Sequence, residues 1–366
     1  EIIPTVKLPK FSHITDYIEF FGRGIFKSVI LKDVYYDEGI FNFGMVSVSR
    51  EIDRLKNTNM NKEKVNESLS METETGNPIV VTIREGLFTL SRGIGQVMFQ
   101  NNAFSGVLML AGLLCNSWQL ALLAVLGNLV STATALICKY NREAIKDGLF
   151  GFNGTLVGIA VGVFMEITWL SVLLLAFTSA LSTWITRLFS LQQRLSGFTA
   201  PFILSVWILL IGCNWFGPSL LVTGAAAGIT PSPDLPAAFC LNIGQVMFQG
   251  NTIWAGLFFL LAISINSRIN AFYVILASSV SIGVALITGM DNAALNAGLI
   301  GYNGVLCAIA VGSKSLQSGL WAVLSVLISI LLQWIGMQWN IITLTAPFVL
   351  SVWVVTILRD FLEKSR

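Results

Sequence analysis

The sequence has almost none of the side chains on which enzymes depend. Its single histidine, His13, lies near the beginning of the chain, so no Ser/His/Asp or Cys/His catalytic set can be assembled farther along. No glycine-rich phosphate loop is recognisable. The five cysteines show no CxxC spacing and lie in or beside apolar stretches. Such cysteines are typically small buried residues, with disulfides as the alternative. We expect no enzymatic activity, no metal and no cofactor.

Charge is also scarce over most of the chain. Ten of the 22 Lys and Arg residues and twelve of the 20 Asp and Glu residues lie in residues 1–76. The whole sequence is 54% hydrophobic, with a mean hydropathy of +0.74. This composition excludes an ordinary soluble globular protein, and no basic patch with interleaved aromatics is present to bind nucleic acid. The sequence therefore predicts a polytopic membrane protein.

Residues 1–76 form a separate polar block, which we expect to be a partly disordered cytoplasmic tail. Residues 57–75 read as a disordered linker, and no cleavable signal peptide is recognisable. Between Ile14 and Ile25 the apolar residues follow the spacing of one helix face. This stretch is either a short helix on the membrane surface or a partly ordered tail.

The second half of the chain repeats the first, motif by motif. Residues 95–100 (Gly-Gln-Val-Met-Phe-Gln) recur unchanged at 244–249, residues 151–154 (Gly-Phe-Asn-Gly) return as 301–304 with tyrosine for phenylalanine, and the Thr-Ala-Pro-Phe of 199–202 returns at 345–348. Offsets of 149, 150 and 146 residues show that whole units are duplicated in order. This period is typical of the two-repeat membrane transporters and channels.

Five apolar runs are expected to span the membrane in each half. They cover roughly 103–116, 118–138, 148–165, 167–186 and 199–215, and then 252–266, 270–288, 297–312, 317–337 and 341–358. The weaker segments 79–99 and 235–249 are better read as re-entrant half-helices. With the tail inside, every basic residue after Arg92 falls on the cytoplasmic side, so both termini are predicted to be cytoplasmic.

An odd number of spans per half has a geometric consequence. Two similar halves joined after five spans must face opposite ways across the bilayer. The predicted fold is an all-α polytopic membrane protein of two inverted homologous halves, each with five transmembrane helices and one re-entrant half-helix. We assign residues 77–228 to the first repeat and 229–366 to the second. The repeated motifs should converge near the pseudo-twofold axis.

The repeated polar residues each have a structural and a functional interpretation. The side chains of Gln96 and Gln245 either form hydrogen bonds between helices or line the wall of a pore as polar groups. Thr199 and Thr345 either bond their own proline-kinked helices or meet at the membrane midplane, where each proline also frees backbone carbonyls. The aromatic residues beside them are either core packing or a slot for a flat solute.

The expected spans contain no Asp, Glu, Lys, Arg or His, and Glu166 lies only at a predicted outer edge. Ion carriers and proton-coupled carriers place ionisable groups on their pathway. A pathway with only amides, hydroxyls, carbonyls and aromatics suits a small neutral polar solute that crosses passively.

These motifs resemble the urea transporters, a family of channel-like proteins. The likeness rests on residues 95–99 with Asn101 and Asn102, residues 148–156, their partners at 244–248 and 301–306, and the two Thr-Ala-Pro-Phe segments. It covers roughly residues 78–360. The family commonly has proline before this threonine, where Ser196 and Ile342 stand here, and phenylalanine where Tyr302 stands.

The resemblance implies passive urea conduction through one pore in each protomer of a plasma-membrane homotrimer. Urea would stack between aromatic rings while amides, hydroxyls and carbonyls replace its hydration. The residues that the resemblance places on the pore are Gln96, Val97, Phe99, Phe152, Leu156, Thr199, Gln245, Val246, Phe248, Tyr302, Leu306 and Thr345. The alternatives are a channel for ammonia, short amides or water, and a membrane scaffold that transports nothing.

Overall fold

The computed structural model describes residues 78–192, 195–222 and 232–364, and no strand occurs in these ranges. The described helices belong to one compact unit, Pro78–Arg366. Our interpretation of residues 1–76, with the surface helix and the linker, lies outside the described residues. The fold class expected from the sequence is confirmed: this is an all-α multi-pass membrane protein.

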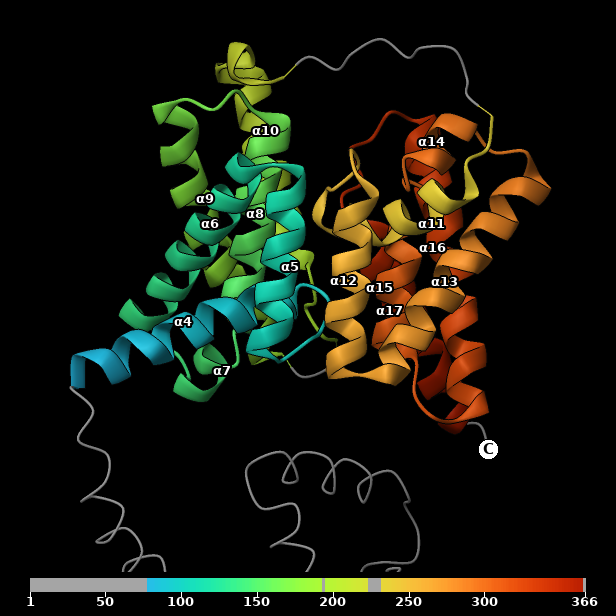
Figure 1. The fold of residues 1–366 in the computed structure, drawn as a ribbon, viewed down its shortest axis with the longest axis horizontal. Coiled ribbons are helices and arrows are strands. Elements are labelled where there is room, and N and C mark those ends of the chain that lie inside the picture. Colours follow the sequence, from blue (N-terminus) through green and yellow to red (C-terminus); the bar gives the residue numbers. More distant parts are fainter. Residues whose placement is uncertain (1–77, 193–194, 223–231, 365–366) are drawn as a thin grey trace, which may run out of the picture. The chain divides into compact units, whose positions relative to one another are not determined.

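The helices follow one another in the same order in both repeats (Figure 1). The first repeat contains α4 (Pro78–Gln96), α5 (Ala103–Asn116), α6 (Trp118–Ile137), α7 (Arg142–Lys146), α8 (Gly151–Phe164), α9 (Trp169–Leu191), α10 (Ala200–Phe216) and the 3₁₀ turn η1 (Pro218–Leu220). The second contains α11 (Leu235–Gly244), the 3₁₀ turn η2 (Gln245–Met247), α12 (Ile253–Asn266), α13 (Arg268–Thr288), α14 (Asn292–Asn296), α15 (Tyr302–Val311), α16 (Leu316–Gln338) and α17 (Ala346–Lys364).

Equivalent helices begin with equivalent caps. The side chain of Asn102 accepts hydrogen bonds from the first turn of α5, and that of Thr252 does so for α12. One extended serine then ends each of these helices and caps the next, Ser117 between α5 and α6 and Ser267 between α12 and α13. Such side chains satisfy backbone N–H groups that have no partner within the helix. The same serine cap therefore forms a tight turn between α5 and α6 and between α12 and α13.

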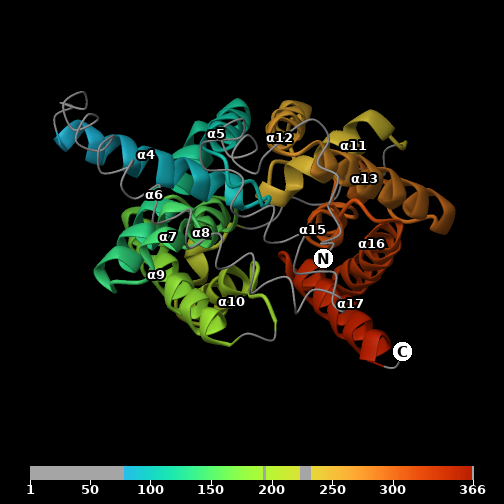
Figure 2. The same cartoon turned by 90° about the horizontal axis from the view of Figure 1, so that it is seen from below.

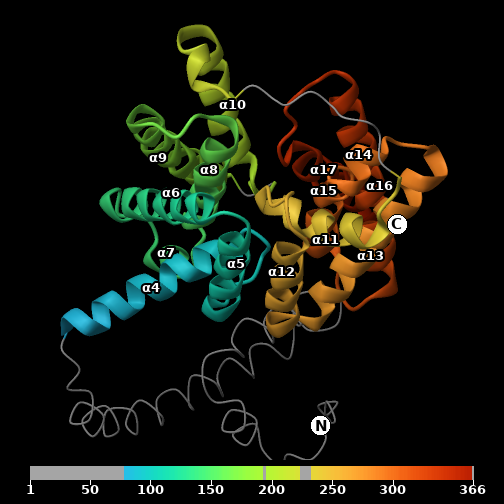
Figure 3. The same cartoon turned by 45° about the horizontal axis from the view of Figure 1, so that its top comes forward.

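The two repeats meet along α5 and α12, which lie side by side in Figures 2 and 3. Asn116, at the end of α5, donates to Gln249 just before α12 (2.7 Å). Asn266, at the end of α12, donates to Gln100 just before α5 (2.8 Å). The end of each helix therefore lies beside the beginning of the other. The two helices are antiparallel, which is the arrangement that an inverted repeat requires.

Four of the described helices, α6, α9, α13 and α16, are long and apolar enough to cross a membrane unaided. Of the others, α4 and α17 have 19 residues each and carry charged side chains. The rest are shorter: α5 and α12 have 14 residues each, about 21 Å at 1.5 Å per residue, against a hydrocarbon core of about 30 Å. Interrupted helices are tolerated at membrane depth where protein surrounds them. The residues of α8 from Asn153 to Val161 are all buried, as are those of α15 from Tyr302 to Ile309.

Replacing Gln100 by leucine should weaken the junction between the repeats. Gln100 is fully buried, accepts from Asn266 and donates to the carbonyl of the buried Met98, so the variant leaves that carbonyl without this donor. An unsatisfied polar group costs about 1–3 kcal/mol, which should appear as a lower thermal midpoint in detergent. Gln338→Leu is the matched control, because Gln338 is exposed at the end of α16. Equal midpoints for both variants would show that this contact contributes nothing.

Candidate functional site

The two threonines of the repeated motif meet between the repeats. Thr199 Oγ1 and Thr345 Oγ1 are 2.7 Å apart, and each residue is 1% exposed. Thr199 is the residue before α10 and Thr345 the residue before α17. The sequence prediction that these hydroxyls meet is confirmed as geometry. Since the pseudo-twofold exchanges the two residues, their contact lies on the axis, where the two helix N-termini face each other.

The prolines have a different role from the one expected. Pro201 occupies the first turn of α10, and Pro347 is the second residue of α17. At these positions a missing N–H costs nothing, because the first N–H groups of a helix have no intrahelical partner. The prolines therefore begin the helices instead of kinking them, and our expectation that they free midplane carbonyls was wrong.

The asparagine of each Phe/Tyr-Asn-Gly motif supports these helix beginnings. Asn153 Oδ1 accepts a hydrogen bond from the backbone N–H of Phe202 (3.3 Å), and Asn303 Oδ1 accepts from that of Phe348 (3.1 Å). Both asparagines are fully buried. Each therefore fixes the start of α10 or α17 relative to the central helix, α8 or α15, and so positions the threonine one turn earlier.

Aromatic rings from both repeats gather in two clusters. Phe99 lies 5.9 Å from Phe198 and 6.0 Å from Phe348, measured between ring centroids. Phe248 lies 5.8 Å from Phe164 and 6.2 Å from Phe202. The pseudo-twofold that exchanges Phe99 with Phe248 also exchanges Phe348 with Phe202. The two clusters therefore lie on opposite sides of the axis that carries the threonine contact.

Phe99 and Phe248 occupy unusual backbone conformations. Their φ angles are +61° and +60°, in the left-handed region that residues other than glycine rarely adopt. The chain turns back there, and the N–H of the next glutamine bonds to the carbonyl of Gly95 (3.0 Å) or Gly244 (3.1 Å). A Cβ at Gly95 would lie 2.5 Å from the Gln100 carbonyl oxygen, so only glycine fits. Strain retained at the same place in both repeats is typical of functional sites.

The two candidate amides differ in their surroundings. Gln96 donates to the Asp147 carbonyl (2.9 Å), as the interpretation of a bond between segments predicts. The side chain of Gln245 has no hydrogen-bond partner in the described part of the chain, and it lines a cavity. A Cβ at Gly250 would lie 2.3 Å from Gln245 Nε2, so glycine leaves room for this amide. Of these two amides, that of Gln245 is the one that lines a cavity open to a solute.

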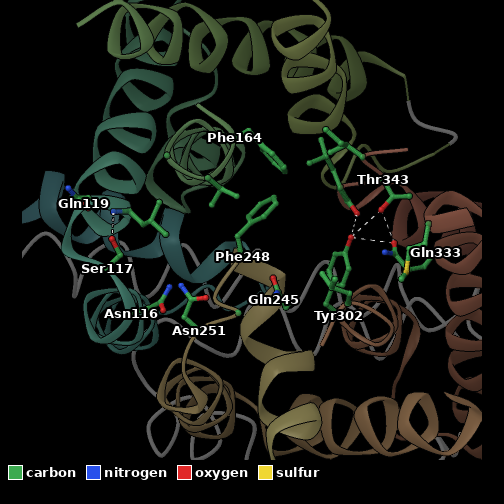
Figure 4. A pocket seen from close by; sticks show the side chains of 18 of the residues that line it. Asn116, Ser117, Gln119, Phe164, Gln245, Phe248, Asn251, Tyr302, Gln333 and Thr343 are labelled. Carbon is green, nitrogen blue, oxygen red and sulfur yellow. Dashed lines mark hydrogen bonds between the residues drawn. The ribbon is translucent and has the colours of Figure 1, made fainter. Parts of the chain in front are cut away.

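That cavity, which we call the vestibule, has a volume of about 640 Å³ and is lined by both repeats (Figure 4). Phe164 and Phe248 lie near its middle, with Gln245 below them in the figure. Tyr302, Gln333 and Thr343 form one side, and Asn116 and Asn251 lie on the other. None of its lining residues is Asp, Glu, Lys, Arg or His.

The remaining candidates lie deeper in the protein. Val97, Leu156, Val246 and Leu306 are at most 1% exposed and belong to the hydrophobic core. Phe152 packs against that core and has no ring contact within the described residues. Tyr302 does line the vestibule, where its hydroxyl donates to the Leu344 carbonyl.

Sequence reasoning missed four rings of this region and several amides of the vestibule wall, among them Gln333. Phe202 and Phe348 stand in the repeated Thr-Ala-Pro-Phe and could have been found there. Phe164 and Phe198 have no aromatic counterpart in the other repeat, so nothing in the pattern marked them. Gln333 lies within a long apolar run and carried no signal beyond its polarity.

Comparison with known proteins connects this geometry to one family. The family model described as "Urea transporter" matches residues 87–360. The chain is similar to urea transporter 1 of Ovis aries, at 36% identity over 243 residues, which cover 60% of this chain and 61% of that protein. It is also similar to urea transporter 1 of Rattus norvegicus, at 34% identity over 255 residues and 64% of each chain. The chain thus spans less than two thirds of the length of these relatives.

Proposed function

Because this chain belongs to the urea transporter family, we propose that it conducts urea passively across the membrane, through a pathway between its inverted repeats. The observation that carries the proposal is the threonine pair at the axis, with one phenylalanine cluster on either side. Urea is flat, neutral and polar on its edges. Rings can pack on its faces while hydroxyl and amide groups replace water at its edges.

The proposed pathway runs from the vestibule past Gln245 and Phe248 to Thr199 and Thr345, and then past Phe99 to the opposite side. Gln96, Val97, Phe152, Leu156, Val246, Tyr302 and Leu306 complete the proposed pore wall. The buried members of this set would shape the slots, since a solute that has lost its hydration needs close contact on both faces.

We further propose that the protein lies in the plasma membrane as a homotrimer with one pore per protomer. The distribution of basic residues supports cytoplasmic termini, because Lys139, Arg142 and Arg187 all fall on the side predicted to be inside. In this orientation the vestibule faces the outside of the cell, because it is lined by Asn116 and Ser117 of the α5–α6 connection, which carries no basic residue.

Liposomes that contain the purified chain should take up urea faster than protein-free liposomes. Because no lining residue of the vestibule titrates near neutral pH, the urea permeability should be unchanged between pH 6 and 8 and with or without a sodium gradient. Light scattering after a urea gradient measures it, with glycerol, water and ammonium as comparison solutes. Uphill accumulation driven by either gradient would contradict passive conduction.

The comparison solutes separate the alternatives. Water or ammonia flux without urea flux would identify a channel for another small solute. A folded protein that conducts none of these solutes would favour a scaffold.

A further inference from the structure

The vestibule contains an amide whose orientation is set by a chain of hydrogen bonds. The chain starts at the backbone N–H of Phe348, which can only donate, so the atom that it contacts on Asn303 must be the oxygen. The nitrogen of Asn303 therefore points the other way, and it donates to Gln333 Oε1 (3.1 Å). The Gln333 oxygen also accepts from Thr343 Oγ1 (2.8 Å).

This arrangement leaves the nitrogen of Gln333 as a donor without an acceptor in the described part of the chain. Gln333 is only 4% exposed, yet its side chain lines the vestibule beside Tyr302 and Thr343 (Figure 4). Rotating the amide by half a turn would bring two donors together at Asn303, so the alternative orientation is excluded. An N–H group is thus held at the wall of a polar, uncharged cavity.

The described part of the first repeat has no such donor at the equivalent place. At the equivalent place Asn153 donates to Thr186 Oγ1 (3.3 Å), and Thr186 in turn donates to the Ser182 carbonyl of its own helix (2.8 Å). The corresponding hydrogen-bond chain therefore ends on backbone. The two repeats therefore differ at this place, with Thr186 in the first where Gln333 stands in the second. Since both repeats fold in the same way, the fold alone does not require Gln333.

We propose that the nitrogen of Gln333 receives the carbonyl oxygen of the solute in the vestibule, before the solute passes Phe164 and Phe248. This inference rests on the proposed function and adds to it a preference among solutes. The ligands are small neutral molecules with an accessible carbonyl oxygen, such as urea and simple amides. Thiourea has nearly the same shape but offers a sulfur, which is a weak acceptor. The site therefore favours urea over thiourea.

The test compares urea and thiourea permeability in liposomes containing the full chain. Gln333→Met keeps the length of the side chain and removes the donor. Gln333→Glu removes the amide donor and keeps an oxygen for Asn303 and Thr343; it is assayed at high pH, because burial favours the protonated carboxyl, whose O–H could still donate. Gln338→Met on the same helix is the control, since Gln338 is exposed and does not line the vestibule.

One lost hydrogen bond should lower urea permeability by about two- to tenfold in both Gln333 variants. Thiourea permeability should fall less, so the ratio of urea to thiourea decreases, while Gln338→Met leaves both values unchanged. An equal decrease for both solutes, or an unchanged ratio, would overturn the inference and leave the proposed function intact. No urea flux in the unmodified chain would overturn both.

Discussion

Replacing both threonines of the Thr199–Thr345 pair by valine should nearly abolish urea conduction without unfolding the protein. Each of these residues is 1% exposed and its hydroxyl bonds to the other at 2.7 Å, so valine keeps the shape and deletes the polar groups at the axis. A desolvated solute then finds no hydroxyl there, and each lost hydrogen bond costs about 1–3 kcal/mol. We expect each single variant to slow urea by roughly three- to a hundredfold and the double variant by more.

The single and double threonine variants should rank differently in thermal stability than in urea permeability. Thr199→Val or Thr345→Val alone leaves one buried hydroxyl without its partner, whereas the double variant removes both partners together. The single variants should therefore have the lower thermal midpoints, although the double variant has the lower flux. Thr155→Val is the control, because this buried hydroxyl bonds to Gly151 of its own helix. Normal urea flux in the double variant would show that the hydroxyls serve the fold alone.

The architecture could be predicted because duplication and charge are linear properties of the sequence. Identical motifs at nearly constant offsets and the placement of basic residues required two inverted halves, and the antiparallel contact of α5 with α12 has that form. The meeting of Thr199 and Thr345 followed from the same symmetry. When a residue is repeated in both inverted halves, its two copies either meet on the pseudo-twofold axis or lie at two positions that the axis exchanges.

Side-chain partners could not be predicted in the same way. Gln96 and Gln100 stand in the same repeated hexapeptide, and polarity alone does not show which partner each side chain binds. Gln100 is fully buried against the other repeat, whereas Gln96 bonds to a neighbouring carbonyl. The distinction arises from the left-handed turn at Phe99, which reverses the chain between the two glutamines. A turn of that kind at phenylalanine has no sequence signature, because glycine is the usual residue there.

The proline expectation failed for a related reason. A proline inside an apolar run favours a kink, but a proline one residue after a helix begins has no such effect. The last expected membrane span begins at residue 341, whereas α17 begins at Ala346. Residues 341–345 are apolar enough to continue the span, so hydropathy could not place this boundary. Asn303 places it, by accepting the Phe348 N–H.

The close packing of α6 against α8 in the first repeat is the basis of the second large expected effect. α6 and α8 approach through glycines, and a Cβ at Gly158 would lie 2.0 Å from the Leu123 carbonyl oxygen and 3.0 Å from the Ala124 nitrogen. Both are backbone atoms, which cannot move aside as a flexible side chain could. Small residues permit such contacts between membrane helices, and even one methyl group forces the helices apart.

Gly158→Ala should therefore reduce both the folded yield and the urea permeability of the protein that does fold. Overpacking costs about 1–3 kcal/mol, and the displaced α8 carries Asn153, which holds the beginning of α10 and hence Thr199. Thermal midpoints in detergent and urea flux per folded protein measure the two effects. Gly283→Ala on α13 is the control, because nothing lies within 4 Å of a Cβ there. If Gly158→Ala matched Gly283→Ala in both measurements, α8 would not transmit packing to the threonine pair.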